Sequence, residues 1–250
     1  MKGVVSALYS ACVYAFFFAT FLFAIGFVEG LSPRTIDSGG TGLLPMSLAI
    51  DLALLTLFAL QHSIMARPGF KKVWTRIVPA EAERSTYVLF ASAALAFLMW
   101  QWRALPQMVW NVYDPRAAEA LRILSFAGFG IVLLSTFLIS HFHLFGISQG
   151  FARLLGLKPA EQKFTTPLFY RWVRHPLYTG FIVAFWAAPE MSLGHLVFAS
   201  ATTGYILVGI WLEERDLVAH FGERYIHYRE QVGMLVPKFR LRTSRPATER

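Results

Sequence analysis

Residues 4–28 read VVSALYSACVYAFFFATFLFAIGFV, an apolar run without a single charged side chain. A helix needs about 20 such residues to cross roughly 30 Å of hydrocarbon, so this run is long enough to span a bilayer. It is too long for the core of a signal peptide and has no convincing cleavage site, so we expect it to be retained as a transmembrane helix. Backbone groups in hydrocarbon must be satisfied internally, which favours a helix here.

The composition of the whole chain agrees with this interpretation. Of its 250 residues, 56% are apolar and 15% are charged, and the mean hydropathy is +0.49. A soluble domain has about 25% charged residues. The formal charge of +8 comes from basic residues in a few loops and the tail, which indicates membrane topology and no nucleic-acid partner. The single cysteine, Cys12, excludes an internal disulfide.

Further apolar runs follow the first. The second, third and fourth are long enough, or nearly so, to cross: residues 43–65, 85–102 and 121–147. A fifth, residues 177–212, is interrupted by Pro189, Glu190 and Gly194, and its first half is too short to span alone. We interpret it as a helical hairpin or re-entrant pair that leaves and returns on one side, with a cavity at the break. The sequence therefore predicts an all-α integral membrane bundle of about five transmembrane helices.

Basic residues separate the two sides of this bundle. With the N-terminus inside, the external loops carry only Arg34, Arg103 and Arg116. The internal loops and the tail carry many more, namely Arg67, Lys71, Lys72, Arg76, Arg84, Arg153, Lys158, Lys163, Arg171, Arg174 and the basic residues from Arg215 to Arg250. The positive-inside rule then predicts that the N-terminus and the polar working face are cytoplasmic. Residues 213–232 have the spacing of an amphipathic helix that lies along the membrane or caps the hairpin.

The densest polar segment is FYRWVRHPLYTG at residues 169–180. Pro176 disfavours helix at His175, so Arg174 and His175 are expected in an extended turn where a helix begins. Free N–H groups at a helix start hold a carboxylate or phosphate, and Arg174 adds a planar cationic fork. The alternative is that Arg174 and His175 reach towards lipid headgroups.

Two adjacent carboxylates, Glu213 and Glu214, stand at the end of the fifth apolar region. Buried carboxylates need partners, so they are expected to pair with Arg174 or Arg171 or to bind a cationic ligand. The alternative is a solvated helix end.

Histidines mark the inner ends of two other runs. His141 and His143 are two residues apart and do not share a helix face, which argues against a metal pair; no metal site is expected. An ionisable group at membrane depth is a functional candidate, and His141 is favoured. For His62, structural hydrogen bonding is the favoured interpretation.

These residues carry a resemblance to known enzymes. RHPLYTG at 174–180, the interrupted hairpin and EERDL at 213–217 resemble the superfamily of isoprenylcysteine carboxyl methyltransferases and phospholipid methyltransferases, which use S-adenosylmethionine at the cytoplasmic side. QHSIMARPGFKKVWTRIVP at 61–79, residues 83–103 and HFHLFGISQ at 141–149 are similar to the methanethiol S-methyltransferases, which make dimethyl sulfide. One departure is His143, where that family is expected to have an acidic residue.

The resemblance implies a cofactor site. Arg174 and the N–H groups around His175 suit the cofactor carboxylate, and Glu213 or Glu214 suits its ammonium group. Aromatic faces and hydroxyls for the adenosine or the sulfonium would come from the same motif, and the implied cofactor-binding set is Tyr170, Arg174, His175, Leu177, Tyr178, Gly180, Glu213 and Glu214. The resemblance also implies a single domain over residues 1–250, with N-terminal helices at 1–120 and the cofactor-binding catalytic part at 121–250.

A thiol acceptor raises the question of a base. Alkyl thiols have a pKa of about 8.5 or above, so little thiolate exists at neutral pH. The candidates for the base are His141 and Glu214. The expected partners are methanethiol and membrane lipid, with no obligate protein partner. Three alternatives stay open: methylation of a lipid or an isoprenylcysteine, reduction with a nicotinamide cofactor, and a non-enzymatic denitrification-associated membrane protein.

Overall fold

The computed structural model describes residues 2–40, 42–157 and 166–238. Lys158, Lys163 and the basic residues of the tail after Lys238 lie outside the described residues. The helices are α1 (Lys2–Glu29), α2 (Leu44–Ala66), α3 (Pro68–Trp74), α4 (Ala80–Gln101), α5 (Pro115–Ile139), α6 (His141–Leu144), α7 (Ile147–Leu155), the 3-10 helix η1 (Leu168–Arg171), α8 (Pro176–Trp186), α9 (Leu193–Phe221) and α10 (Glu223–Gln231); the strands are β1 (Met108–Asn111) and β2 (Glu190–Ser192).

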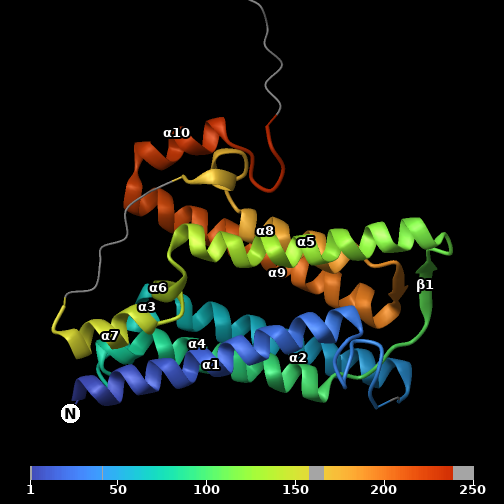
Figure 1. Cartoon of the computed structure of the whole chain (residues 1–250), viewed down its shortest axis with the longest axis horizontal. Coiled ribbons are helices and arrows are strands. Elements are labelled where there is room, and N and C mark those ends of the chain that lie inside the picture. Colours follow the sequence, from blue (N-terminus) through green and yellow to red (C-terminus); the bar gives the residue numbers. More distant parts are fainter. Residues whose placement is uncertain (1, 41, 158–165, 239–250) are drawn as a thin grey trace, which may run out of the picture.

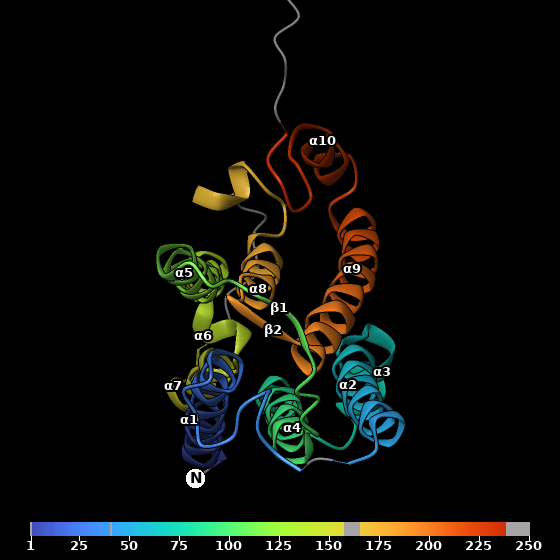
Figure 2. The same ribbon diagram turned by 90° about the vertical axis from the view of Figure 1, so that its right-hand side faces the viewer.

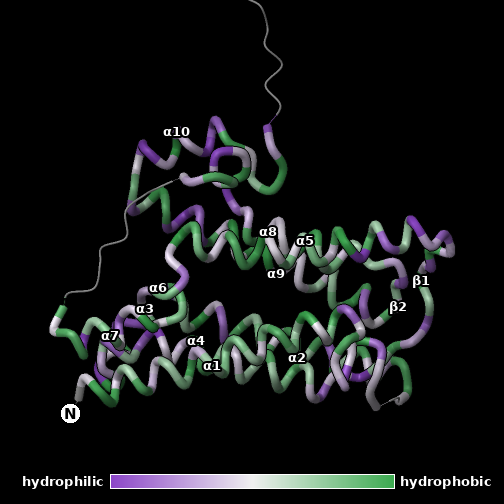
Figure 3. The backbone as a smooth tube through the Cα atoms, in the orientation of Figure 1, coloured by the Kyte–Doolittle hydropathy of each residue, from purple (hydrophilic) through white to green (hydrophobic). Residues whose placement is uncertain are grey.

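The long helices make this an integral membrane protein. Four of them are long and apolar enough to cross a bilayer: α1, α2, α5 and α9. Helix α4 has 22 residues and is roughly 33 Å long, also sufficient to cross, although its first turn carries Glu81 and Glu83. Large apolar side chains on these helices face outward, such as Leu8, Leu60 and Trp211, which suits a lipid surrounding. Figure 3 shows apolar positions along the long helices and hydrophilic ones in α10. The predicted all-α membrane bundle is confirmed.

The interrupted hairpin is formed by α8 and α9. Helix α8 has only 11 residues, and the chain then passes through an extended segment and β2 before the 29-residue helix α9 returns. Ser192 caps α9 by accepting a hydrogen bond from the His195 N–H at 3.0 Å. Figure 1 shows that α8 begins and α9 ends next to α10, whereas β1 and β2 pair at the opposite end of the molecule. We call these the α10 end and the strand end.

The helices form two groups (Figure 2). Helices α1, α4 and α2 lie side by side, and α5, α8 and α9 lie above them, with α9 also contacting α2. Their shared core is aromatic: Trp102 and Phe198 meet edge to face with ring centroids 5.8 Å apart, and Phe21 of α1 and Phe129 of α5 meet at 6.5 Å. Rings from both groups thus fix the two layers against each other. The expected functional division near residue 120 stays a prediction.

Two predicted segments differ from the structure. The span expected at residues 121–147 begins earlier, at Pro115, and ends at Ile139, where Ser140 turns out of the helix before α6 and α7. The helix expected at 213–232 is divided, because α9 runs on to Phe221 and Gly222 adopts a φ of 57° before α10. Glycine has no Cβ and accepts this left-handed conformation readily, so it permits the reversal.

Candidate active site

The polar segment lies at the start of α8, as the sequence predicts. Pro176 occupies the first turn of α8, and His175 before it has a φ of −126° and a ψ of 62°. The backbone N–H groups of Arg174 and His175 donate to the carbonyls of Gly233 and Met234, at 2.8 and 3.2 Å. The tail after α10 therefore pairs with the segment before α8, and these two N–H groups are already in use.

Arg174 joins three elements at this point. Its Nε donates to Glu214 Oε1 at 2.7 Å, and its Nη1 donates to the carbonyls of Arg229 and Val232. The side chains of Arg174 and Glu214 are 8% and 13% exposed, so little water competes for the pair. This pairing was one of the sequence expectations. The guanidinium connects the start of α8 to the end of α9 and to α10.

His175 lies between the two carboxylates of α9. Its Nε2 is 3.1 Å from Glu214 Oε1, and its Nδ1 is 3.8 Å from Glu213 Oε2. Glu214 also has Arg229 Nη1 at 3.9 Å. Glu213 differs in its surroundings: it is 45% exposed and accepts a hydrogen bond from the Tyr178 hydroxyl at 3.1 Å. Of the two carboxylates, Glu213 is therefore the one open to a cationic ligand.

The first turn of α8 offers donors for an anion beside this carboxylate. The N–H groups of Leu177 and Tyr178 have no acceptor among the described residues, and Pro176 has no N–H. A helix start with free N–H groups attracts a carboxylate or phosphate. Donors for an anion and a carboxylate for a cation thus lie on neighbouring helices joined by the Tyr178–Glu213 hydrogen bond, which suits a zwitterionic ligand.

Tyr170 and Tyr228 border the same region. Tyr170 lies in η1, and its carbonyl accepts a hydrogen bond from the Tyr228 hydroxyl. Burial, and then the nearby Glu213 carboxylate, raise the pKa of Tyr170. Burial also raises the pKa of Tyr228, to about 12. Both hydroxyls stay protonated at neutral pH and can act as hydrogen-bond donors.

Gly180 lies on the face of α8 that packs on α5. A Cβ at Gly180 would be 2.6 Å from the Gly128 carbonyl oxygen and 2.9 Å from the Val132 side chain. The structure thus gives Gly180 a packing role in helix contact, and its role in cofactor binding stays a prediction.

His141 is held by other elements. Its Nε2 is 2.8 Å from the Tyr14 hydroxyl of α1, its Nδ1 is 2.7 Å from Thr136 Oγ1 of α5, and its ring stacks on Phe137. Burial lowers the pKa of His141. His143 contacts Gln149, and burial and then Arg84 lower the pKa of His143. Because both nitrogens of His141 have partners, its surroundings are those of a structural histidine, and its catalytic role stays a prediction.

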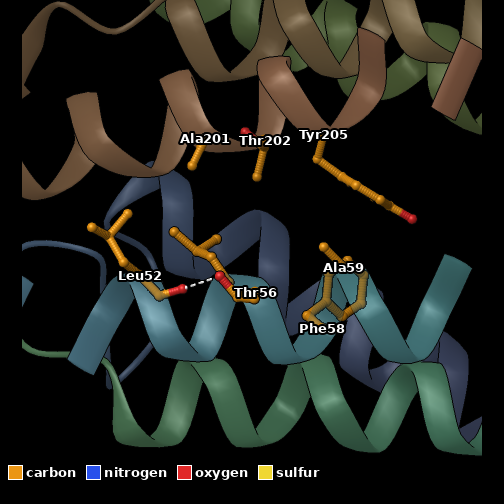
Figure 4. A pocket seen from close by; sticks show the side chains of 8 residues that line it. Leu52, Thr56, Phe58, Ala59, Ala201, Thr202 and Tyr205 are labelled. Atoms are coloured by element: carbon orange, nitrogen blue, oxygen red, sulfur yellow. Dashed lines mark hydrogen bonds between the residues drawn. The ribbon is translucent and has the colours of Figure 1, made fainter. Parts of the chain in front are cut away.

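A hollow of about 120 Å³ lies between α2 and α9. Figure 4 shows side chains of the two helices facing each other across it; its lining consists of Leu52, Leu55, Thr56, Phe58, Ala59, Ala201, Thr202 and Tyr205. The lining is mainly apolar, with Tyr205 as its largest polar side chain. No three His, Cys, Asp or Glu side chains within the described ranges lie close enough together to hold a metal ion.

Sequence reasoning missed several residues here. Arg229 and Tyr228 come from α10, the carbonyls of Val232 and Gly233 from the tail, and Tyr205 from the middle of α9. Backbone carbonyls carry no sequence signal, and a tyrosine inside an apolar run resembles any core aromatic residue. Only the amphipathic helix predicted over residues 213–232 pointed to α10.

Comparison with known proteins gives a consistent result. A family model described as NnrU protein matches residues 52–230. Methanethiol S-methyltransferase 1 of Bradyrhizobium diazoefficiens is 53% identical over 93% of this chain and 82% of its own length. Methanethiol S-methyltransferase of Mycobacterium tuberculosis is 49% identical over 95% of this chain and 98% of its own length. Nurim of Rattus norvegicus is more distant, 30% identical over 68% of each chain. No solved structure matches the chain.

Proposed function

Because the chain belongs to the NnrU protein family and to the same family as the methanethiol S-methyltransferases, we propose that it methylates methanethiol with S-adenosylmethionine as the donor. The relatives support the reaction, since two proteins about half identical to this chain over nearly its whole length carry that name. The observation that carries the choice of donor is the zwitterion site at the start of α8, where free N–H groups lie beside Glu213.

The described residues fit S-adenosylmethionine. The N–H groups of Leu177 and Tyr178 would hold its carboxylate and Glu213 its ammonium group, while Tyr170 would lie against the adenosine or the sulfonium. Arg174 and His175 would then act mainly by holding Glu214, α8 and α10 together. When bound, the sulfonium supplies an electrophilic methyl group. The protein contributes orientation and exclusion of water, and positioning of this kind accounts for much of the acceleration in group transfer.

We further propose that the α10 end is cytoplasmic. Helices α3, α7 and α10 lie at the same end of the molecule as the start of α1 (Figure 1). They carry basic residues that include Lys71, Lys72, Arg153 and Arg229, whereas the loops at the strand end have few. An excess of lysine and arginine is typical of cytoplasmic loops. The donor would then be taken from the cytoplasm.

The direct test is a transfer assay with the purified protein in lipid nanodiscs. Methyl-labelled S-adenosylmethionine and methanethiol are expected to give volatile labelled dimethyl sulfide. Label that enters the lipid fraction instead would support a lipid acceptor. A folded protein that binds no S-adenosylmethionine in calorimetry and forms no labelled product would refute the proposal.

A further inference from the structure

His62 has one ring nitrogen that the fold does not use. Its Nε2 is 2.8 Å from the Tyr87 hydroxyl of α4, whereas its Nδ1 is buried and has no hydrogen-bond partner among the described residues. Buried polar atoms in native proteins nearly always have partners, so each exception calls for an explanation. With the proton on Nε2 and donated to Tyr87, Nδ1 carries a free lone pair that can accept a proton.

The His62 ring packs behind the wall of the hollow between α2 and α9. Phe58 stacks on it with ring centroids 5.5 Å apart, and Tyr205 meets it edge to face at 6.3 Å; both rings also line the hollow. Ser63, the next residue, donates to the Tyr205 hydroxyl at 3.4 Å. The free nitrogen therefore belongs to a residue that packs directly behind the lining of the hollow, against Phe58 and Tyr205.

The hollow suits a very small apolar molecule. An apolar cavity of about 150 Å³ takes up benzene, so about 120 Å³ is sufficient for an acceptor of two heavy atoms such as methanethiol. The lining combines apolar side chains with the hydroxyls of Thr56, Thr202 and Tyr205, as is typical of small-molecule sites.

The same cluster reaches towards the proposed donor site. The Tyr178 hydroxyl, which donates to Glu213, interacts electrostatically with the hydroxyls of Tyr205 and Tyr87. Tyrosines of α8, α9 and α4 thus lie in the region between Glu213 and His62. Among the described residues, the titratable or charged groups around the imidazole include Tyr87 and Arg84 of α4 and Tyr205 of α9.

We propose that the hollow between α2 and α9 receives the thiol and that His62 Nδ1 is the base that removes its proton. This inference rests on the proposed function. The S–H bond breaks and its proton goes to Nδ1, leaving a thiolate and an imidazolium. A sulfur lone pair of the thiolate forms the new bond to the methyl carbon. The bond from that carbon to the sulfonium sulfur breaks, and its electron pair stays on that sulfur as a neutral thioether. The imidazolium returns its proton to water.

The two bases expected from the sequence are less suited to this step. Both nitrogens of His141 are hydrogen-bonded, to Tyr14 and Thr136. Glu214 is held by Arg174 and His175. His141 would have to give up a buried partner before it could accept a proton, and a proton on Glu214 would weaken its pairing with Arg174.

The test replaces His62 by asparagine and by glutamine, with His227→Asn on the exposed face of α10 as the matched control. Both His62 variants are expected to lose about 100- to 10,000-fold in kcat/KM for methanethiol at pH 7, the range supplied by one general base. Their dissociation constants for S-adenosylmethionine, measured by calorimetry, should stay within about twofold of wild type, because no residue of the donor site changes.

The pH profile distinguishes a base from a structural residue. The kcat/KM of the wild type should be nearly constant from neutral pH up to the thiol pKa of about 8.5, because His62 takes the proton. The kcat/KM of the His62 variants should rise about tenfold per pH unit over this range, because these proteins depend on thiolate formed in solution. For the same reason, the loss of kcat/KM relative to wild type should be smaller with trifluoroethanethiol, an acidic thiol, than with ethanethiol. Filling the hollow by Ala59→Phe should raise KM for methanethiol about tenfold or more without altering donor binding.

Three outcomes would overturn the inference: His62 variants that keep more than about a third of wild-type activity, a loss of equal size at every pH and with both thiols, or an Ala59→Phe protein with unchanged KM. If both His62 variants fail to bind the donor, the Ala59→Phe measurement decides. A wild-type protein that neither binds S-adenosylmethionine nor methylates any thiol refutes the proposed function instead, so the two failures are distinguishable.

Discussion

Glu213 and Glu214 are adjacent in sequence but differ in their surroundings. Successive residues on a helix point about 100° apart, so one carboxylate of α9 turns towards Arg174 and the other towards Tyr178. The first is held by the buried side chains of Arg174 and His175, and the second is 45% exposed. The pair therefore divides into a carboxylate that stabilises the site and one that is free to bind a ligand.

This division predicts the effect of Glu213→Gln. The variant should bind S-adenosylmethionine about 10- to 100-fold more weakly, because it loses one charge-assisted hydrogen bond to the ammonium group. Calorimetry would measure the dissociation constant, with Glu223→Gln on α10 as the control that leaves binding unchanged. Equal affinities of the two variants would contradict the assignment of Glu213.

Arg174→Met should lower stability more than binding. It leaves Glu214 buried beside His175 without its main partner and removes the donors to two carbonyls, at a cost of about 3–5 kcal/mol. Thermal unfolding in detergent would measure this loss of stability. The double variant Arg174→Met with Glu214→Met should be no less stable than Arg174→Met alone, because the unpaired charge is gone. A loss equal to the sum of two single variants would contradict this coupling.

At the scale of elements, the short helix α8 is held against α5 by two glycines. A Cβ at Gly128 would lie 2.6 Å from the Gly180 carbonyl oxygen and 2.7 Å from the Ala184 nitrogen, both backbone atoms. Small residues let two membrane helices approach closely, and van der Waals packing then replaces the hydrophobic driving force that lipid cannot supply. This contact fixes the start of α8, and with it the proposed donor site.

A matched pair on α5 tests this contact. Gly128→Ala should destabilise the protein by about 1–3 kcal/mol, because backbone cannot move away as a flexible side chain can. Gly130→Ala, two residues along the same helix, has open space around its Cβ and should be neutral or stabilising by up to about 1 kcal/mol. Thermal unfolding of both proteins would compare them. Similar midpoints would show that the close approach of α5 and α8 is unimportant.

At the scale of the whole molecule, the two ends differ in charge and in structure. The α10 end carries the polar site and most of the described basic residues, whereas the strand end is closed by β1 and β2. Opposite ends of a membrane protein face different compartments, and basic loops favour the cytoplasm. The proposed orientation is therefore a property of the entire bundle.

Single cysteines in a Cys12→Ser background would test this orientation. Tyr113→Cys at the strand end, where the native side chain is 87% exposed, should react with a membrane-impermeant maleimide in intact cells. Glu230→Cys on α10 should react only after the cells are opened. The reverse pattern would place the polar site outside and contradict a cytoplasmic supply of the donor.

Much of the fold could be predicted from local patterns. The first apolar run becomes α1, and the break that the sequence marks at Pro189 and Glu190 separates α8 from α9. Hydropathy did not predict the helix ends at Ser140 and Gly222, where a polar and a small residue interrupt the chain. A window averaged over many residues cannot detect a reversal at one backbone position.

The sequence by itself determined that this is an all-α membrane protein and where most of its spans lie, and it offered Arg174 as a partner for Glu213 or Glu214. Hydropathy, charge and motifs can be read over short stretches of chain. Only the tertiary structure decided that Glu213 is open and Glu214 is held, that His141 has both nitrogens occupied, and that His62 has one free. The physical reason is that a polar group's availability depends on its partners. His62 and Tyr87, or Arg174 and Glu214, come from distant segments that meet only when the helices pack.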